Sequence, residues 1–159
     1  MGIFDAARNN NVVEIKSCLK YTEINARDGR GSTPLILAAY YNNAEAAEAL
    51  LIAGADIELC DRMGNTALMG ACFKGYIRVA QLLIHYGASV ETVNGNEATA
   101  LTFAATFGHD ALIELLLANG ANPLKKDLSG RNPIDHALIQ ENAQCYELMV
   151  AATKSMIAE

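Results

Sequence analysis

The sequence predicts an all-α repeat protein, and three observations support this fold class. Four segments recur in register, each opening with Asp or Asn at residues 28, 61, 94 and 127, so the period is 33 residues. Three of them lead into a Thr, a short helical stretch and a second stretch with aliphatic residues at helical spacing. The same three repeats close with a Gly-Ala pair, at residues 54–55, 87–88 and 120–121. A constant period of this length indicates stacked copies of one helical module, each burying its apolar faces against its neighbours.

The first flank, residues 1–25, is expected to form an N-terminal capping helix pair. Ala6-Ala7 matches the paired small residues of the later first helices. Glu14 and Ser17 stand in columns that the later repeats fill with apolar residues such as Val79 and Leu82. A polar outer face suits an end unit because no neighbour covers it.

Residues 26–58, 59–91 and 92–124 are predicted as three full repeats. In each, a Thr is placed to cap a short first helix, and these residues are Thr33, Thr66 and Thr99. The second helices are predicted at about 44–53, 77–86 and 110–119. The Gly of each closing pair supplies the left-handed residue that ends the second helix. The chain that follows is predicted to form a β-hairpin whose tip projects from the stack.

Residues 125–159 are predicted as a C-terminal capping repeat. Asn132-Pro133-Ile134 opens a first helix as in the other repeats, but Thr153 stands where they have Gly. Without a left-handed residue to end it, the last helix is expected to run on through Lys154 and Met156. No linker or low-complexity tract interrupts the chain, so we expect a single domain over residues 1–159.

The repeats resemble those of the ankyrin family, whose motif is T-P-L-H-x-A. The resemblance rests on Thr33-Pro34-Leu35, Thr66-Ala67-Leu68 and Thr99-Ala100-Leu101, each followed by paired small residues, and it extends over the whole chain. It implies an ankyrin-repeat solenoid of stacked helix pairs with projecting β-hairpin loops. In that family, the hairpin tips and the exposed face of the first helices line a concave groove that binds partners.

Two departures from the family pattern carry structural expectations. The motif His is absent, and Ile36, Met69, Thr102 and Asp135 stand in its place, so any hydrogen bonds it makes must be replaced or missing. Glu97 occupies a turn position that the other repeats fill with Gly. Because a residue with a Cβ is strained at positive φ, we expect a distorted or strained hairpin at residues 94–98, with simple drift of one turn as the alternative.

Composition limits the classes of function. The net charge of −6 argues against a nucleic-acid partner, which would require a basic stripe. The longest apolar stretches are far too short to cross a membrane, and no secretory signal is visible. Three of the four cysteines stand on repeat positions that other repeats fill with small or apolar residues, so they are read as free thiols, which suits a reducing compartment such as the cytoplasm. A monomer is expected.

The groove that the resemblance implies can be mapped onto this chain. The candidate partner-binding residues are Arg30, Tyr40, Tyr41, Arg62, Met63, Phe73, Lys74, Asn96, Thr106 and Phe107. Aromatic residues, Met and Arg are the types enriched in binding hot spots. We expect the four aromatic residues to form an apolar centre, and a basic rim to favour a partner segment with acidic and apolar character. The alternative is that Tyr40 and Phe73 pack as local core.

The favoured function is a non-enzymatic protein–protein interaction module without cofactors. The alternative is a regulatory subunit or effector that masks a partner enzyme. Catalysis by Cys72 with His85 or His109 is disfavoured, because Cys72 replaces a tightly packed Ala and a reactive thiol needs an exposed site. No pair of Cys or His has metal-ligand spacing. The recurring Asp and Asn of the hairpins are expected to accept hydrogen bonds from nearby backbone N–H groups.

Overall fold

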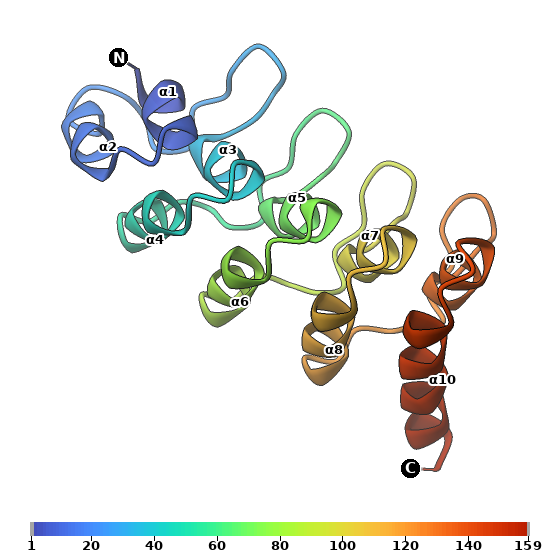
Figure 1. Cartoon of the computed structure of the whole chain (residues 1–159). Coiled ribbons are helices and arrows are strands. Elements are labelled where there is room, and N and C mark those ends of the chain that lie inside the picture. The colour runs from blue at the N-terminus through green and yellow to red at the C-terminus, as the bar shows by residue number, and fades with distance from the viewer. Residues whose placement is uncertain (1, 159) are drawn as a thin grey trace. The chain divides into compact units, whose positions relative to one another are not determined.

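The computed structural model describes residues 2–158, and over this range every regular element is helical, as the sequence predicts. The chain divides into two compact units, residues 1–88 and 89–159. The first contains α1 (Ile3–Arg8), α2 (Val12–Cys18), α3 (Pro34–Tyr40), α4 (Ala44–Ile52), α5 (Ala67–Lys74) and α6 (Ile77–His85). The second contains α7 (Ala100–Thr106), α8 (Asp110–Ala118), α9 (Pro133–Ile139) and α10 (Ala143–Ala158), as Figure 1 shows. The expected single domain stays a prediction.

Helix pairs stack in register within each unit. In the first unit, α1, α3 and α5 pack in succession, and α2, α4 and α6 form a second row. In the second unit, α7 packs on α9 and α8 on α10. The predicted helix positions are therefore confirmed to within a residue or two, including the last helix, which continues past Lys154 as expected.

Adjacent residues of the second helices differ in burial. In α6, Val79, Ala80 and Leu83 are fully buried, whereas Leu82 is only half-buried. Paired small residues such as Ala38-Ala39 in α3 are also fully buried, because the neighbouring helices approach closely there. Apolar spacing thus locates the helix, but only the packing shows which of two neighbouring leucines lies in the core.

The first helices begin at the predicted caps. The hydroxyls of Thr33, Thr66 and Thr99 accept hydrogen bonds from backbone N–H groups three residues later, at 3.2, 3.3 and 3.3 Å. At Thr66, Thr99 and Asn132, the residue that replaces the missing His completes the cap. The backbone N–H of the cap residue donates to Met69 Sδ at 3.5 Å, Thr102 Oγ1 at 3.0 Å and Asp135 Oδ2 at 3.0 Å. In each of these repeats, the cap satisfies two backbone N–H groups that have no partner within the helix.

Four projecting loops precede the first helices, and we call them finger 1 (residues 28–32), finger 2 (61–65), finger 3 (94–98) and finger 4 (127–131). Each opens with a side-chain oxygen that accepts two backbone N–H groups, from residues two and four positions later. This confirms the predicted role of the recurring Asp and Asn. Residues 2–158 contain no β-strand and a single isolated bridge, between Cys60 and Thr66. The hydrogen bonds of the turns therefore hold the hairpins in place of a strand ladder.

Finger 3 keeps the geometry of the others in spite of Glu97. Its N–H groups and carbonyls form the same pair of backbone bonds, from Glu97 to Asn94 O and from Asn94 to Ala98 O, both at 3.0 Å. Glu97 has φ 57°, in the region that the glycines occupy in the other fingers. The expected distortion is therefore wrong, whereas the expected strain is present as the positive φ of Glu97 in an unchanged turn.

Replacing Glu97 by Gly is expected to stabilise the protein by about 0.5–1 kcal/mol, because Gly adopts positive φ without a Cβ clash. Urea unfolding followed by circular dichroism measures the change. Asn96→Gly is the matched control, since Asn96 is not among the residues with positive φ and Gly there only adds freedom to the unfolded chain. A destabilised Glu97→Gly variant would contradict the assignment of strain.

Finger 4 is clamped by a hydrogen bond between Asp127 and His136 of its own first helix. His136 Nε2 lies 2.7 Å from Asp127 Oδ2, and their side chains are only 17% and 11% exposed. Burial acts to raise the pKa of Asp127, but hydrogen bonds from the Ser129 hydroxyl, from His136 and from the backbone N–H groups of Arg131 and Ser129 outweigh it and lower the pKa to about 2.

A lowered pKa means that folding favours the charged form of Asp127, so its contribution to stability is present above pH 3.8 and is lost as the pH falls toward about 2. We expect Asp127→Asn to lose about 1–2 kcal/mol of unfolding free energy at pH 5. That difference should disappear as the pH is lowered through this window, in urea titrations at each pH. Equal stability of the two proteins at pH 5 would show that the clamp contributes nothing.

Candidate functional site

A groove of 690 Å³ opens in the first unit, on the side of the fingers. Its lining comes from Arg8 in α1, from Asp28, Arg30 and Ser32 in finger 1, from Ile36, Leu37, Tyr40 and Tyr41 in and just after α3, and from Asp61, Arg62 and Met63 in finger 2. We call this cavity the finger groove. Five of the candidate residues of the sequence analysis therefore line one cavity: Arg30, Tyr40, Tyr41, Arg62 and Met63.

Tyr40 is the hub of an aromatic cluster beside the finger groove. Its ring lies parallel to that of Phe73 at 6.5 Å and edge-on to that of Tyr41 at 5.7 Å. The Lys74 ammonium lies 5.0 Å from the centre of the Tyr40 ring. Phe73 and Lys74 belong to α5, so Tyr40 connects two neighbouring repeats. Tyr40 therefore packs against the next repeat, as the alternative of local core expected. It also keeps 40% of its surface exposed, as a binding surface requires.

Tyr41 and Met63 present the largest freely accessible apolar surfaces of the finger groove. Tyr41 is 50% exposed and Met63 is 64% exposed. Tyr41 follows the end of α3, and Met63 lies at the tip of finger 2, so the two come from different repeats. Exposed apolar residues that gather in one concave surface are typical of a binding site, whereas scattered ones carry no such meaning.

Two arginines hold the fingers together by bonds to backbone or aspartate. Arg27 donates through one nitrogen to the carbonyl of Gly31 at 2.8 Å and also to the carbonyl of Cys60, which joins finger 1 to the chain that leads into finger 2. Arg8 lies 3.1 Å from Asp5 and 3.4 Å from Asp28. Arg27 and Arg8 therefore position the walls of the finger groove.

Three charged residues that line the finger groove, Arg8, Asp28 and Asp61, were not among the candidates from the sequence. A signal for Arg8 was present, because alignment on the paired small residues places it in the column of Tyr40 and Phe73. The first helix of the N-terminal cap thus extends the column of variable surface residues. The aspartates were predicted correctly as turn residues, but nothing in their pattern showed that they also face the cavity.

The remaining candidates, Asn96, Thr106 and Phe107, lie in the second unit. Phe107 follows α7 and is 48% exposed. The Thr106 hydroxyl donates to the Thr102 carbonyl at 2.7 Å, so it is already satisfied within the helix. Asn96, at the tip of finger 3, accepts a hydrogen bond on its backbone carbonyl from the N–H of Leu128 in finger 4, at 2.9 Å. This bond connects the two fingers of the second unit.

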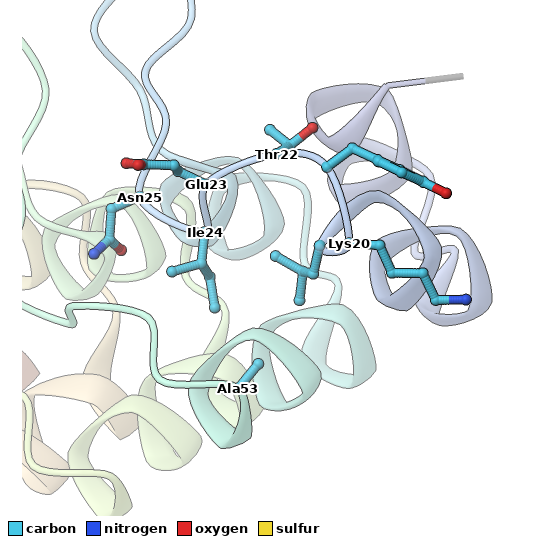
Figure 2. Close-up of a pocket in the computed structure, with 8 residues that line it drawn as sticks. Lys20, Thr22, Glu23, Ile24, Asn25 and Ala53 are labelled. Carbon is cyan, nitrogen blue, oxygen red and sulfur yellow. The ribbon is translucent and has the colours of Figure 1, made fainter.

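A second cavity, of 630 Å³, lies between the loop after α2 and the end of α4 (Figure 2). It is lined by residues 19–25 and Ala53, and Figure 2 shows Ile24 directed toward Ala53. The Asn25 side chain accepts the backbone N–H of Asp56 at 3.0 Å, which connects this loop to the chain after α4. No His or Cys lines the cavity.

The buried thiols have the wrong properties for nucleophiles. Cys72 is fully buried, and burial raises its pKa to about 12. Burial, together with the neighbouring Asp110 carboxylate at 3.3 Å, raises the pKa of Cys145 to about 12 as well. Both are protonated at neutral pH, and a thiolate is the reactive form. Over residues 2–158, no three His, Cys, Asp or Glu side chains gather as a metal site would require.

Comparison with known proteins agrees with this architecture. Residues 3–94 match the family described as ankyrin repeats (3 copies), and residues 101–150 match ankyrin repeats (many copies). A curated relative, the ankyrin repeat domain-containing protein SAT10 of Stachybotrys chartarum, is 39% identical over 61 residues. That match covers 38% of this chain and 3% of the relative.

No helix within residues 2–158 has the length and apolar character needed to cross a membrane. The period of the fingers, the caps of the first helices and the two family matches all lead to one assignment. This chain belongs to the ankyrin-repeat family, whose members serve as protein–protein interaction modules.

Proposed function

We propose that this protein is a non-enzymatic interaction module that binds a segment of a partner protein in the finger groove. The observation that carries the proposal is the convergence of Tyr41, Met63 and Arg62 on one cavity of 690 Å³. Aromatic residues, Met and Arg supply much of the binding energy in protein interfaces. Finger 2 supplies Arg62 and Met63 and the end of α3 supplies Tyr41, so a partner segment can contact two repeats along its length.

The charge of the finger groove supports a partner segment with acidic and apolar character. Three arginines and two aspartates line it, and Lys74 lies beside it on Tyr40. The whole chain carries a net charge of −6, so this region is more positive than its surroundings. Complementary charge accelerates association and selects against partners of the wrong sign.

Photo-crosslinking in the organism of origin tests the proposal, because it captures whichever protein occupies the groove. A benzophenone amino acid replaces Met63 in the finger groove, and in a separate variant it replaces Ile52, which lies at the end of α4 outside the groove. Both side chains are strongly exposed, at 64% and 71%. We expect a discrete protein adduct at position 63 that is absent at position 52 and is lost when Tyr41→Ala is added.

Adducts at position 52 alone, or adducts at position 63 that persist in the Tyr41→Ala background, would move the binding site away from the finger groove. If the captured partner is an enzyme, its activity in the presence of this protein decides whether the module scaffolds it or masks its active site. Scaffolding is the favoured role, and inhibition would establish the regulatory alternative.

A further inference from the structure

We infer that the tips of fingers 1 and 2 form an anion-binding site, in which Arg62 and Arg30 bind a carboxylate or phosphate group of the partner segment. This inference rests on the proposed function, because the anion belongs to the segment that occupies the finger groove. It adds the specificity-determining residues and the chemical group that they recognise.

Four arginines surround the first two fingers, and they divide into two pairs. Arg8 forms ion pairs with Asp5 and Asp28. Arg27 donates hydrogen bonds to the carbonyls of Gly31 and Cys60. Arg30 and Arg62 are exposed, and neither forms an ion pair with any of residues 2–158. The guanidinium groups of Arg30 and Arg62 are therefore available to a ligand, whereas those of Arg8 and Arg27 are held by partners within the protein.

The aspartates of the finger groove form no ion pair with these two arginines. Asp28 accepts the N–H groups of finger 1 on one oxygen and faces Arg8 with the other. Asp61 accepts the N–H groups of Met63 and Asn65, at 2.9 and 3.0 Å. Each turn thus uses one carboxylate oxygen, and the guanidinium groups of Arg30 and Arg62 remain without an ion-pair partner among residues 2–158.

Arg62 is held in place by finger 1. A Cβ built on Gly31 would lie 2.9 Å from Arg62 Cγ and 3.3 Å from its backbone N, so the side chain of Arg62 packs directly on the glycine. Gly31 also has φ 78°, a backbone conformation that residues with a Cβ rarely adopt. A long side chain that is seated before binding loses less conformational entropy when it engages a ligand.

The guanidinium group determines which ligand chemistry fits. Its planar fork donates two parallel hydrogen bonds to a carboxylate or a phosphate, and charge-assisted bonds of this kind are stronger than neutral ones. An acidic residue and a phosphorylated residue present the same anionic oxygens. The site is therefore assigned by this shared chemistry, and the experiment separates the two sources.

Phage-displayed random dodecapeptides selected on the intact protein provide the probe. A selected peptide is synthesised as found, with its acidic residues changed to amides, and with phosphoserine in their place. We expect the amide form to bind the wild type at least about tenfold more weakly than the acidic form. Arg62→Gln and Arg30→Gln should each reduce this difference, and Arg62→Lys should restore only part of it because Lys lacks the fork.

Arg78→Gln is the control, since Arg78 is exposed in α6, pairs with Glu45 and does not line the finger groove. It should keep the full difference between the acidic and amide peptides. Tighter binding of the phosphoserine peptide would identify phosphate as the anion, and tighter binding of the acidic peptide would identify carboxylate.

Two results would overturn the anion site while the proposed function stands. In one, the peptide loses affinity for Tyr41→Ala, but its amide form binds the wild type equally well. In the other, the acidic preference is unchanged in both Arg30→Gln and Arg62→Gln. If no selected peptide responds to Tyr41→Ala, the finger groove is not the binding site, and both the proposed function and this inference fail.

Discussion

Leu83→Ala is expected to lower the free energy of unfolding by about 2–5 kcal/mol. Leu83 is completely buried in α6, where α4 packs on the same helix and close-packed side chains leave no room to collapse around a cavity. The loss combines the transfer free energy of the removed atoms with the cost of the cavity that remains. Urea unfolding monitored by far-ultraviolet circular dichroism, a general helix signal, gives the value.

Leu82→Ala provides a control with the same chemistry one residue away. Leu82 is only half-buried, so its truncation is expected to cost about 1 kcal/mol. Because stability in repeat proteins is a sum over repeats and their interfaces, both changes are compared in the same repeat. Equal costs for the two leucines, or a larger cost for Leu82, would contradict the register of α6.

The double change Tyr41→Ala and Phe73→Ala is expected to weaken binding of the partner segment by about 30-fold or more, the size of effect found at interface hot spots. Tyr41 lines the finger groove, and Phe73 supports Tyr40 through the stacked contact of their rings at 6.5 Å. Removing both takes away one contact surface and loosens the support of another. Isothermal titration with the segment captured by crosslinking measures the loss.

Tyr21→Ala is the control for this experiment. Tyr21 lies in the same unit, in the loop after α2, and is 91% exposed, but it does not line the finger groove. Its removal should leave affinity unchanged. Because Phe73 also packs against Tyr40, the helical content and unfolding midpoint of the double variant are checked first. Unchanged affinity in a folded double variant would show that the aromatic cluster does not contribute to binding.

Most of the fold can be predicted from the pattern of the repeat. Thr66 predicts the start of α5 because its hydroxyl suits the cap position, and Thr153 predicts the continuation of α10 because no glycine interrupts it. Burial was less predictable. Leu82 and Leu83 look alike in the sequence, and the difference between them depends on how tightly the rows of second helices pack.

The candidate site was predictable in part. The column of Tyr40 and Phe73 follows from the repeat, so the sequence indicates that they share a face. It does not reveal that Arg27 is used to join finger 1 to the following repeat, or that Arg8 faces Asp28, because both contacts connect different repeats through side-chain conformations. Finger 3 shows the same limit, since the turn absorbs Glu97 at positive φ without changing its hydrogen bonds.

Backbone amide NMR shifts during titration with the partner segment captured at position 63 test the central claim most directly. The account predicts shift changes concentrated in finger 1, finger 2 and the last turn of α3, with α4 and α6 unaffected. In the Tyr41→Ala variant the same changes should need a higher concentration of the segment. Shift changes confined to α2, α4 and α6 would contradict the account, because these helices do not build the walls of the finger groove.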